Sequence, residues 1–323
     1  MTDATVARKS AVNGFKAVLN TAGMLLVFVL LFVICSATVG NFFSFANMKG
    51  LALSVSLMGM VACTMLFCLA SGDFDLSIGS IVACAGVLAA VVTNATGSVA
   101  AGICAGIAIG GVSGLVNGYV IARLKINALI TTLATMQIVR GLGYIVSDGK
   151  AVGVTKEGFF VLGTSSIAGI PTPVVITAVC FVVFGVLLER TTFGRNTLAV
   201  GGNMEAARLS GINVDRLKIT IFLLQGFMCG FAGVVLASRM TSGQPMTSIG
   251  FELEVISACV LGGVSMSGGV GNISAVIAGV LIMGTVQNAM NLLNVPTFYQ
   301  HVARGLILLG AVLLDRFKQS RSA

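Results

Sequence analysis

The sequence predicts an all-α fold: a polytopic integral membrane protein with about ten transmembrane helices, some of them broken or Gly-rich. Composition supports this, because 56% of the 323 residues are hydrophobic and only 9% are charged, which excludes a soluble domain of this size. A bilayer core takes roughly 20 apolar residues per helix, and ten runs of about that length or somewhat shorter follow one another. They are residues 22–40, 51–70, 78–94, 99–122, 126–146, 172–188, 217–237, 252–266, 273–291 and 298–314.

Two of these runs need separate justification. Run 22–40 follows Lys9 and Lys16 as the apolar part of a signal peptide would. It is about as long as a full span and many spans follow, so we expect a retained helix. Run 252–266 is short and flanked by glycine, which makes it the weakest of the ten. The 41 glycines are typical of helices that pack backbone to backbone in lipid.

The lysines and arginines predict the orientation, because cytoplasmic segments carry an excess of both. With the N-terminus inside, 13 of the 19 lie in cytoplasmic segments and four in external ones. Arg140 and Arg304 remain near the outer ends of spans, where they can snorkel to the interface. An even number of spans returns the C-terminus to the cytoplasm. The 13 are Arg8, Lys9, Lys16, Arg123, Lys125, Arg190, Arg195, Arg208, Arg216, Lys218, Arg316, Lys318 and Arg321, and the four are Lys49, Lys150, Lys156 and Arg239.

The same pattern predicts one transmembrane domain over residues 1–323. Residues 1–21 form a cytoplasmic N-terminal segment, 189–216 a cytoplasmic loop and 315–323 a cytoplasmic tail. The net charge of +8 therefore reflects topology and gives no support to nucleic-acid binding. The eight cysteines lie in predicted spans without a CxxC pair, so we expect small apolar residues, with no disulfide and no metal site.

Two Gly-rich interruptions break the helical pattern, at residues 71–80 and 261–272. Similar apolar sequences follow both, which favours an internal duplication with broken helices near a transport path. Counting spans puts both breaks on the same side of the membrane. In an inverted repeat, an odd number of spans separates equivalent breaks and places them on opposite sides, so either the span count or the repeat is wrong. The candidate path residues in the second break are Gly262, Gly263, Gly268 and Gly269.

Asp73 and Asp75 are candidate path residues in the first break. A carboxylate at mid-bilayer costs roughly 2.5–3.5 kcal/mol on insertion scales, so both need water, a donor or the interface. They can cap helices or line a polar cavity. Equally, they can be solvated acids in a short loop, with Asp75 as the N-cap of a helix that starts near Leu76. No further buried acids or histidines continue a proton relay, which disfavours proton coupling.

The longest polar and basic stretch, residues 189–216, is the part most able to meet a soluble partner. Gly201, Gly202 and Asn203 predict a turn, and residues 204–210 a short helix with Glu205 in its first turn. Gly211 is expected to end that helix in a left-handed conformation. Asn213 or Asp215 then starts a second short helix that runs into the seventh span. Two short helices joined at Gly211 form a compact docking knob, although an ordinary solvated connector fits the same residues.

Within this stretch, Glu205, Ala206, Ala207 and Gly211, followed after nine residues by Ile221, resemble the EAA coupling motif of ABC importer permeases. The motif's final Leu-Pro is replaced by a Leu-Leu pair, as in the sugar branch. The chain as a whole resembles the ribose/xylose/arabinose permease family, most closely its arabinose members. The resemblance is carried by GDFDLSIGS, INALITTLATMQIVRGLGYIVSDGKAVG, TFGRNTLAVGGNMEAARLSGINV and SRMTSGQPMTSIGFELEVISACVLGGVS.

The resemblance implies a permease subunit of a binding-protein-dependent ABC importer in the bacterial inner membrane, which moves a monosaccharide, expected to be L-arabinose, into the cytoplasm. It implies two ATPase subunits, a second permease copy and a periplasmic sugar-binding protein as partners, within membrane lipid. Glu205, Ala206, Ala207 and Gly211 are then the ATPase-coupling residues. On the outer face, Arg239 and residues 238–251, with residues 148–157, are candidates for docking the binding protein.

The chain is not expected to be an enzyme. No G-x-x-x-x-G-K-[ST] phosphate-binding loop is present, so the partner hydrolyses ATP and this chain needs no cofactor. Catalytic triads and zincin signatures are absent, and His301 is expected at the interface. A secondary transporter driven by an ion gradient explains the spans and breaks as well, but leaves the EAA-like loop without a role. An ABC permease for ribose, xylose or another small sugar is also compatible with these residues.

Overall fold

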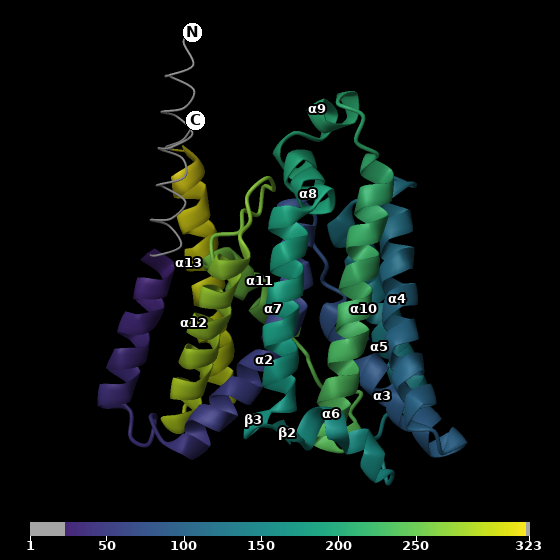
Figure 1. The fold of residues 1–323 in the computed structure, drawn as a ribbon, viewed down its shortest axis with the longest axis vertical. Coiled ribbons are helices and arrows are strands. Elements are labelled where there is room, and N and C mark those ends of the chain that lie inside the picture. The colour runs from purple at the N-terminus through teal and green to yellow at the C-terminus, as the bar shows by residue number, and fades with distance from the viewer. Residues whose placement is uncertain (1–22, 321–323) are drawn as a thin grey trace.

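A computed structural model describes residues 23–320 of the chain, with side chains described through Leu313. The predicted N-terminal segment 1–21 and the last three residues of the predicted tail lie outside this range. Figure 1 shows a bundle of helices that run between two ends, and a helix coincides with each of the ten predicted spans. These are a helix over Gly23–Thr38, α2 (Phe45–Ala70), α3 (Ile78–Thr96), α4 (Val99–Ala122), α5 (Ala128–Ser147), α7 (Thr172–Arg190), α10 (Val214–Met240), α11 (Phe251–Leu261), α12 (Ile273–Leu292) and α13 (Thr297–Ser320).

Short elements mark the two ends of the bundle. One end, called the α9 end below, carries α8 (Thr192–Gly202) and α9 (Met204–Leu209) (Figure 1). The opposite end carries short helices and two-residue strands. Strand β1 pairs antiparallel with β4, and β2 pairs antiparallel with β3. They are β1 (Val152–Gly153), η1 (Glu157–Phe160), α6 (Val161–Thr164), β2 (Ser166–Ile167), β3 (Ile170–Pro171) and β4 (Ser242–Gly243).

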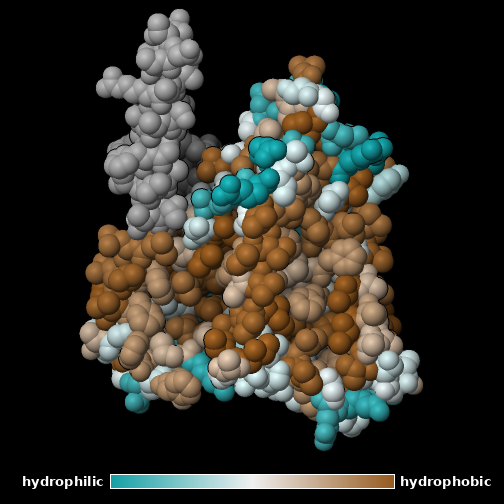
Figure 2. All heavy atoms as spheres, viewed as in Figure 1, coloured by the Kyte–Doolittle hydropathy of each residue, from teal (hydrophilic) through white to brown (hydrophobic). Residues whose placement is uncertain are grey.

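The surface of the bundle is apolar between its ends. Within the described residues, seven helices are long and apolar enough to cross a bilayer, and Gly23–Thr38 and Thr297–Leu313 are shorter apolar helices. Figure 2 shows hydrophobic side chains over the middle of the molecule, with hydrophilic residues gathered towards the two ends. Large apolar side chains such as Ile145 and Val182 are exposed on α5 and α7. Lipid is the solvent for such a surface, so the predicted all-α membrane fold is confirmed.

The eighth crossing is only half helical. Its helix, α11, has 11 residues and is about 16 Å long at 1.5 Å per residue, against a bilayer core of roughly 30 Å. The predicted helix over 252–266 is therefore wrong in its extent. Extended chain supplies the rest: Gly243 packs against Val87, and the Ser248 carbonyl packs against Gly79. Between these contacts the segment follows α3 for about 12 Å.

The third crossing has the same form, because residues 71–77, a turn followed by non-helical chain that we call the first extended segment, precede α3. The two half-helical crossings also have equivalent neighbours. Helix α3 packs against α4, α5 and α10, and α11 packs against α12, α13 and α2. The unit α2–α5 thus repeats as α10–α13, and the two units run in opposite directions between the ends (Figure 1). This is an inverted repeat of the kind found in transporters.

The repeat is also visible in the sequence, but not where we predicted it. Leu69-Ala70-Ser71 and Ser77-Ile78-Gly79 flank the first extended segment, and Leu236-Ala237-Ser238 and Ser248-Ile249-Gly250 flank the second. Likewise, Arg-Gly-Leu begins at Arg140 in α5 and at Arg304 in α13. The predicted pairing of breaks 71–80 and 261–272 is wrong. Both lie at the α9 end, as the span count placed them, and a Cβ on Gly268 would stand 3.0 Å from the amide nitrogen of Gly72.

The core centres on α2, which is buried from Met58 to Ala70. The most extensive contact between two helices is that of α4 with α10. The glycines of α4 recur every four residues and meet the backbone of α10, where a Cβ on Gly110 would stand 2.8 Å from the Cα of Gly230. Small residues allow such approach in lipid, where dispersion rather than the hydrophobic effect holds helices together. The glycines of this seam are Gly106, Gly110, Gly114 and Gly118, whereas Gly102 packs against Ala89 and Thr93 of α3.

Candidate functional site

The α9 end is built from three consecutive helices, each begun by its own capping side chain. The Thr191 hydroxyl accepts from the Gly194 amide at 3.3 Å and starts α8. The Asn203 carbonyl oxygen accepts from the Ala206 amide at 2.9 Å and starts α9. Asn213 caps α10 in the same way at 3.0 Å. Each cap satisfies an amide that the first turn leaves free, which fixes where the chain changes direction.

These caps correct two details of the sequence analysis. Gly201 and Gly202 form the last residues of α8 rather than a turn, and α8 itself was not predicted. No second short helix follows Gly211, because α10 continues from Val214 for 27 residues. The two short helices of the knob are therefore α8 and α9, and they meet at Asn203 rather than Gly211.

Gly211 ends α9 in the left-handed conformation that the sequence predicts, with φ +87°. The Gly211 amide donates to the Arg208 carbonyl at 3.0 Å, and the Ile212 amide donates to the Ala207 carbonyl at 3.1 Å. This pair of bonds is the Schellman motif, which glycine closes at no steric cost. The direction in which α9 leaves α10 therefore depends on one glycine.

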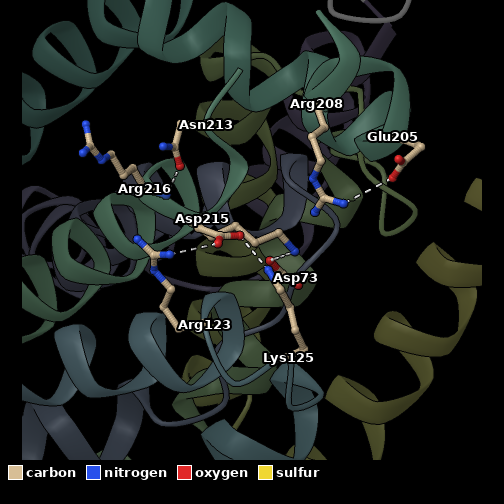
Figure 3. Close-up of polar contacts among 9 residues, drawn as sticks. Asp73, Arg123, Lys125, Glu205, Arg208, Asn213, Asp215 and Arg216 are labelled. Atoms are coloured by element: carbon tan, nitrogen blue, oxygen red, sulfur yellow. Dashed lines mark hydrogen bonds and ion pairs between the residues drawn. The ribbon is translucent and has the colours of Figure 1, made fainter. Parts of the chain in front are cut away.

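The outward side of α9 presents an apolar residue beside a charged pair. Leu209 is 83% exposed, and only Ala207 in this helix is buried. Glu205 and Arg208 form an ion pair at 3.3 Å (Figure 3). Of the predicted coupling residues, Glu205 and Ala206 are thus accessible to a partner, whereas Ala207 fixes the helix to the bundle. Leu209 and the Glu205–Arg208 pair therefore form the exposed face of α9.

Below α9, Asp215 links three elements. Its carboxylate lies 2.6 Å from the Lys125 ammonium and 3.6 Å from the Arg123 guanidinium (Figure 3). Both cations follow α4, so the start of α10 is tied to the connection between α4 and α5. The pair with Lys125 is largely exposed, and such pairs contribute about 1 kcal/mol or less.

Asp73 pairs with a lysine that the orientation analysis placed in the cytoplasm. The Lys218 ammonium lies 2.7 Å from the Asp73 carboxylate, and each residue is 8% exposed. The pair joins the first extended segment to α10. The interpretation of Asp73 as a solvated loop acid is therefore wrong, since its charge is buried and matched. The sequence analysis missed this pair, and the signal that could have indicated it is a lysine next to the apolar run of α10.

Asp75 is fully buried and belongs to a chain of hydrogen bonds. Its carboxylate accepts from both the amide and the hydroxyl of Ser77. The Asn117 amide donates to the Ser77 hydroxyl at 3.0 Å, and the Thr135 hydroxyl donates to the Asn117 carbonyl oxygen at 2.6 Å. Asp75 is neither solvated nor the N-cap of a helix near Leu76, because α3 begins at Ile78. The network instead ties the first extended segment to α4 and α5.

Asp73 also lines a cavity of about 510 Å³ between the two repeat units. The first extended segment and the start of α5 form one wall, while α11, α13 and Met266 form the other. The lining is mostly apolar, with Asp73 and Asn127 as its polar members. Its residues are Gly72, Asp73, Phe74, Leu76, Asn127, Ala128, Leu129, Leu253, Ile256, Met266, Leu308 and Val312.

The four predicted path glycines occupy the connection from α11 to α12. Gly262 packs against the backbone of Ala275, and Gly263 ends α11 with φ +94°. Gly268 and Gly269 lie against the end of α8 rather than in the cavity. The structure therefore places Asp73 at the cavity, but does not bring these four glycines into its lining.

The two Arg-Gly-Leu arginines hold the second half-helical crossing from either side. Arg140 donates to the carbonyls of Pro245 at 2.9 Å and Thr247 at 2.7 Å, and to the Ser80 hydroxyl at 3.2 Å. Arg304 forms an ion pair with Glu254 in the first turn of α11. The prediction that both snorkel to the interface is wrong, because their charged groups are used inside the protein.

At the opposite end, the two predicted docking segments meet. Pairing of β1 with β4 joins residues 148–157 to residues 238–251. Most of the latter segment turns into the bundle towards α11, so only its beginning remains at this surface. The Arg239 guanidinium donates to the Leu53 carbonyl at 3.1 Å and lies in an exposed setting.

Comparison with known proteins identifies the family. Residues 47–312 match the family described as "Branched-chain amino acid transport system / permease component". The chain is 64% identical to the L-arabinose transport system permease protein AraH of Escherichia coli strain K12, over 94% of this chain and 93% of that protein. It is 56% identical to the L-arabinose ABC transporter permease protein AraH of Azospirillum brasilense, over 99% and 94%. It is 42% identical to the ribose import permease protein RbsC of Bacillus subtilis, over 95% and 96%. No solved structure matches. The chain therefore belongs to this family of transport-system permease components.

Proposed function

We propose that this chain is the membrane-spanning permease subunit of a binding-protein-dependent ABC importer for L-arabinose. Relatives that are 64% and 56% identical over more than nine tenths of their length carry L-arabinose in their names, whereas ribose appears at 42%. The chain is a transport component rather than an enzyme, and a separate subunit hydrolyses ATP. The N- and C-termini and the α9 end face the cytoplasm of a bacterium, across its inner membrane.

The observation that carries this proposal is the structured knob of α8 and α9. Glu205, Ala206, Ala207 and Gly211 hold a short helix outside the bundle with Leu209 exposed on it. A solvated connector needs neither three caps nor an exposed leucine. We infer that an ATPase subunit covers α9, and that its closure moves α9 relative to the bundle.

The 510 Å³ cavity supports a transport path between the repeat units. In inverted-repeat transporters the substrate crosses at the interface of the repeats, beside broken helices. Asp73 contributes to this lining directly, and Asp75 positions the same segment. The glycines Gly262, Gly263, Gly268 and Gly269 shape the connection that bounds the path at the α9 end.

The same cavity opens beside exposed apolar faces of α5 and α13, which include Leu129, Ile130, Leu306 and Leu309. We infer that a second permease copy completes the path along these faces, with one ATPase subunit on each copy. At the opposite end, Arg239 and the strand pair β1–β4 form the surface where a periplasmic sugar-binding protein docks.

Reconstituted vesicles test the function. The permease, its ATPase subunit and the sugar-binding protein are placed in proteoliposomes, and uptake of labelled L-arabinose is followed with D-ribose and D-xylose as competitors. Uptake that requires ATP and survives collapse of ion gradients is expected. Uptake driven by an imposed gradient without ATP would instead support a secondary transporter.

Substitution of Gly211 tests the coupling role. No atom lies within 4 Å of the position of a Cβ there, so a substitution acts through backbone strain alone. Gly211→Val should reduce uptake strongly, because a β-branched residue resists the left-handed conformation, which costs roughly 1–2 kcal/mol even for less hindered residues. Gly211→Asn is the matched control and should retain uptake, since asparagine tolerates this conformation. Both proteins should be present in the membrane in equal amount, and equal uptake by both would contradict the role.

A further inference from the structure

Three stretches of backbone meet at glycines beside the end of α8. The first is the end of α2 and the start of the first extended segment, at Ala70 and Gly72. The second is the end of α8 at Gly201, and the third is the connection from α11 to α12 at Gly268 and Gly269. The Gly269 amide donates to the Ala70 carbonyl at 2.9 Å, which closes the contact. We call these residues the glycine junction.

The contacts in the junction are between main chains. A Cβ on Gly201 would overlap the Ala70 carbonyl oxygen and stand 2.5 Å from the Gly269 nitrogen. A Cβ on Gly268 would stand 2.7 Å from the Gly201 carbonyl oxygen, and one on Gly269 would stand 2.8 Å from the Gly202 Cα. Backbone cannot move aside as a flexible side chain does, so displacement of one stretch displaces the others.

The glycine junction lies between α9 and the segments next to α3 and α11. Only Gly202 and Asn203, the N-cap of α9, separate Gly201 from α9, so the junction adjoins the helix that is proposed to face the partner. On the other side it touches the segment that leads into α3 and the connection that follows α11. Each of these segments adjoins a half-helical crossing, because the first leads into α3 and the second follows α11.

We propose that the glycine junction transmits movement of α9 to the extended segment before α3 and to the α11–α12 connection, and that it is the positioning contact through which ATP hydrolysis opens the path. This inference rests on the proposed coupling role of α9. Gly201, Gly268 and Gly269 are then required for transport but not for docking of the ATPase.

Gly201→Ala is the direct test, because Gly201 is helical and alanine there adds a methyl group without backbone strain. In the reconstituted complex, ATP hydrolysis should stay close to that of the unchanged complex. Uptake should fall by about tenfold or more, as expected when a methyl group is forced into a close contact. Gly202→Ala is the matched control in the same helix, since its Cβ would have only an ordinary contact, at 4.0 Å from Gly269. It should leave both activities unchanged.

Unchanged uptake by Gly201→Ala would overturn the proposal. Loss of ATP hydrolysis together with uptake would also overturn it, because the contact would then build the docking surface. Failure of the coupling role itself looks different: the unchanged complex would show no ATP-driven uptake.

A second measurement uses the unchanged complex and does not depend on folding of a variant. Hydrogen–deuterium exchange is measured on residues 71–77 and 262–272 with and without a non-hydrolysable ATP analogue. Exchange should change in both segments when the nucleotide binds the ATPase subunit. No change in either segment, in a complex that retains ATP-driven uptake, would contradict transmission through the junction.

Discussion

Asp73→Ala should lower the free energy of unfolding by about 3–5 kcal/mol, because it leaves the Lys218 charge buried without a partner. Both side chains are about 10% exposed and their charged groups lie 2.7 Å apart. Lys218→Met should have an effect of similar size, since it leaves the Asp73 carboxylate unpaired in the same place. The midpoint of thermal unfolding in detergent solution measures both effects.

Two controls separate burial from charge. Asp215→Ala removes the exposed pair with Lys125 and should cost about 1 kcal/mol or less. The double variant Asp73→Leu with Lys218→Met replaces the buried pair by apolar side chains and should recover most of the lost stability. If the double variant is as unstable as either single variant, the buried pair does not explain the effect. Sugar uptake by a stable double variant then shows whether Asp73 contacts the sugar or only fixes residues 71–77 to α10.

Arg140→Ala should abolish uptake and destabilise the protein, because it removes three hydrogen bonds from the second extended segment and α3. Hydrogen bonds to a charged group contribute about 1.5–3 kcal/mol each, although their contributions are not additive. The carbonyls of Pro245 and Thr247 would lose a donor within the bundle. Uptake and the unfolding midpoint are the measurements.

The internal repeat supplies a matched pair of conservative variants. A lysine cannot reproduce the fork with which Arg140 reaches two carbonyls and a hydroxyl, so Arg140→Lys should lose most of the uptake. Arg304 pairs with the single carboxylate of Glu254, which a lysine can still approach as a point charge. Arg304→Lys should therefore keep most of its uptake. The reverse order would show that the hydrogen bonds of Arg140 do not hold the crossing.

Much of the fold could be predicted from the sequence because apolar length determines where helices form in a bilayer. All ten predicted spans contain a helix, and the left-handed Gly211 follows from glycine's conformational freedom. The half-helical eighth crossing was missed, since hydropathy counts residues and does not distinguish extended chain from helix. The repeat was predicted between the wrong pair of breaks. Its Leu-Ala-Ser and Ser-Ile-Gly motifs are five residues apart in the first unit and nine apart in the second, so the two copies do not align without a gap.

Less of the candidate site could be predicted, because its contacts join residues far apart in the sequence. Counting charges by loop placed Lys218 in water, whereas packing of α10 buries it against Asp73. The glycines at 268 and 269 were assigned to the path on composition alone, and only the structure shows that they touch α8. The helix α8 was missed because its polar residues and two final glycines resemble a loop.

The glycine seam between α4 and α10 has a mechanical consequence. Its main chains touch directly, so few side chains are available to repack and the two helices form a single beam. That beam starts immediately after α9 and reaches the opposite end. If α9 moves as proposed, α4 and α10 are therefore expected to move together as one unit. Bending is then expected at residues 71–77 and 241–250, where turns and extended backbone replace helix in each repeat unit.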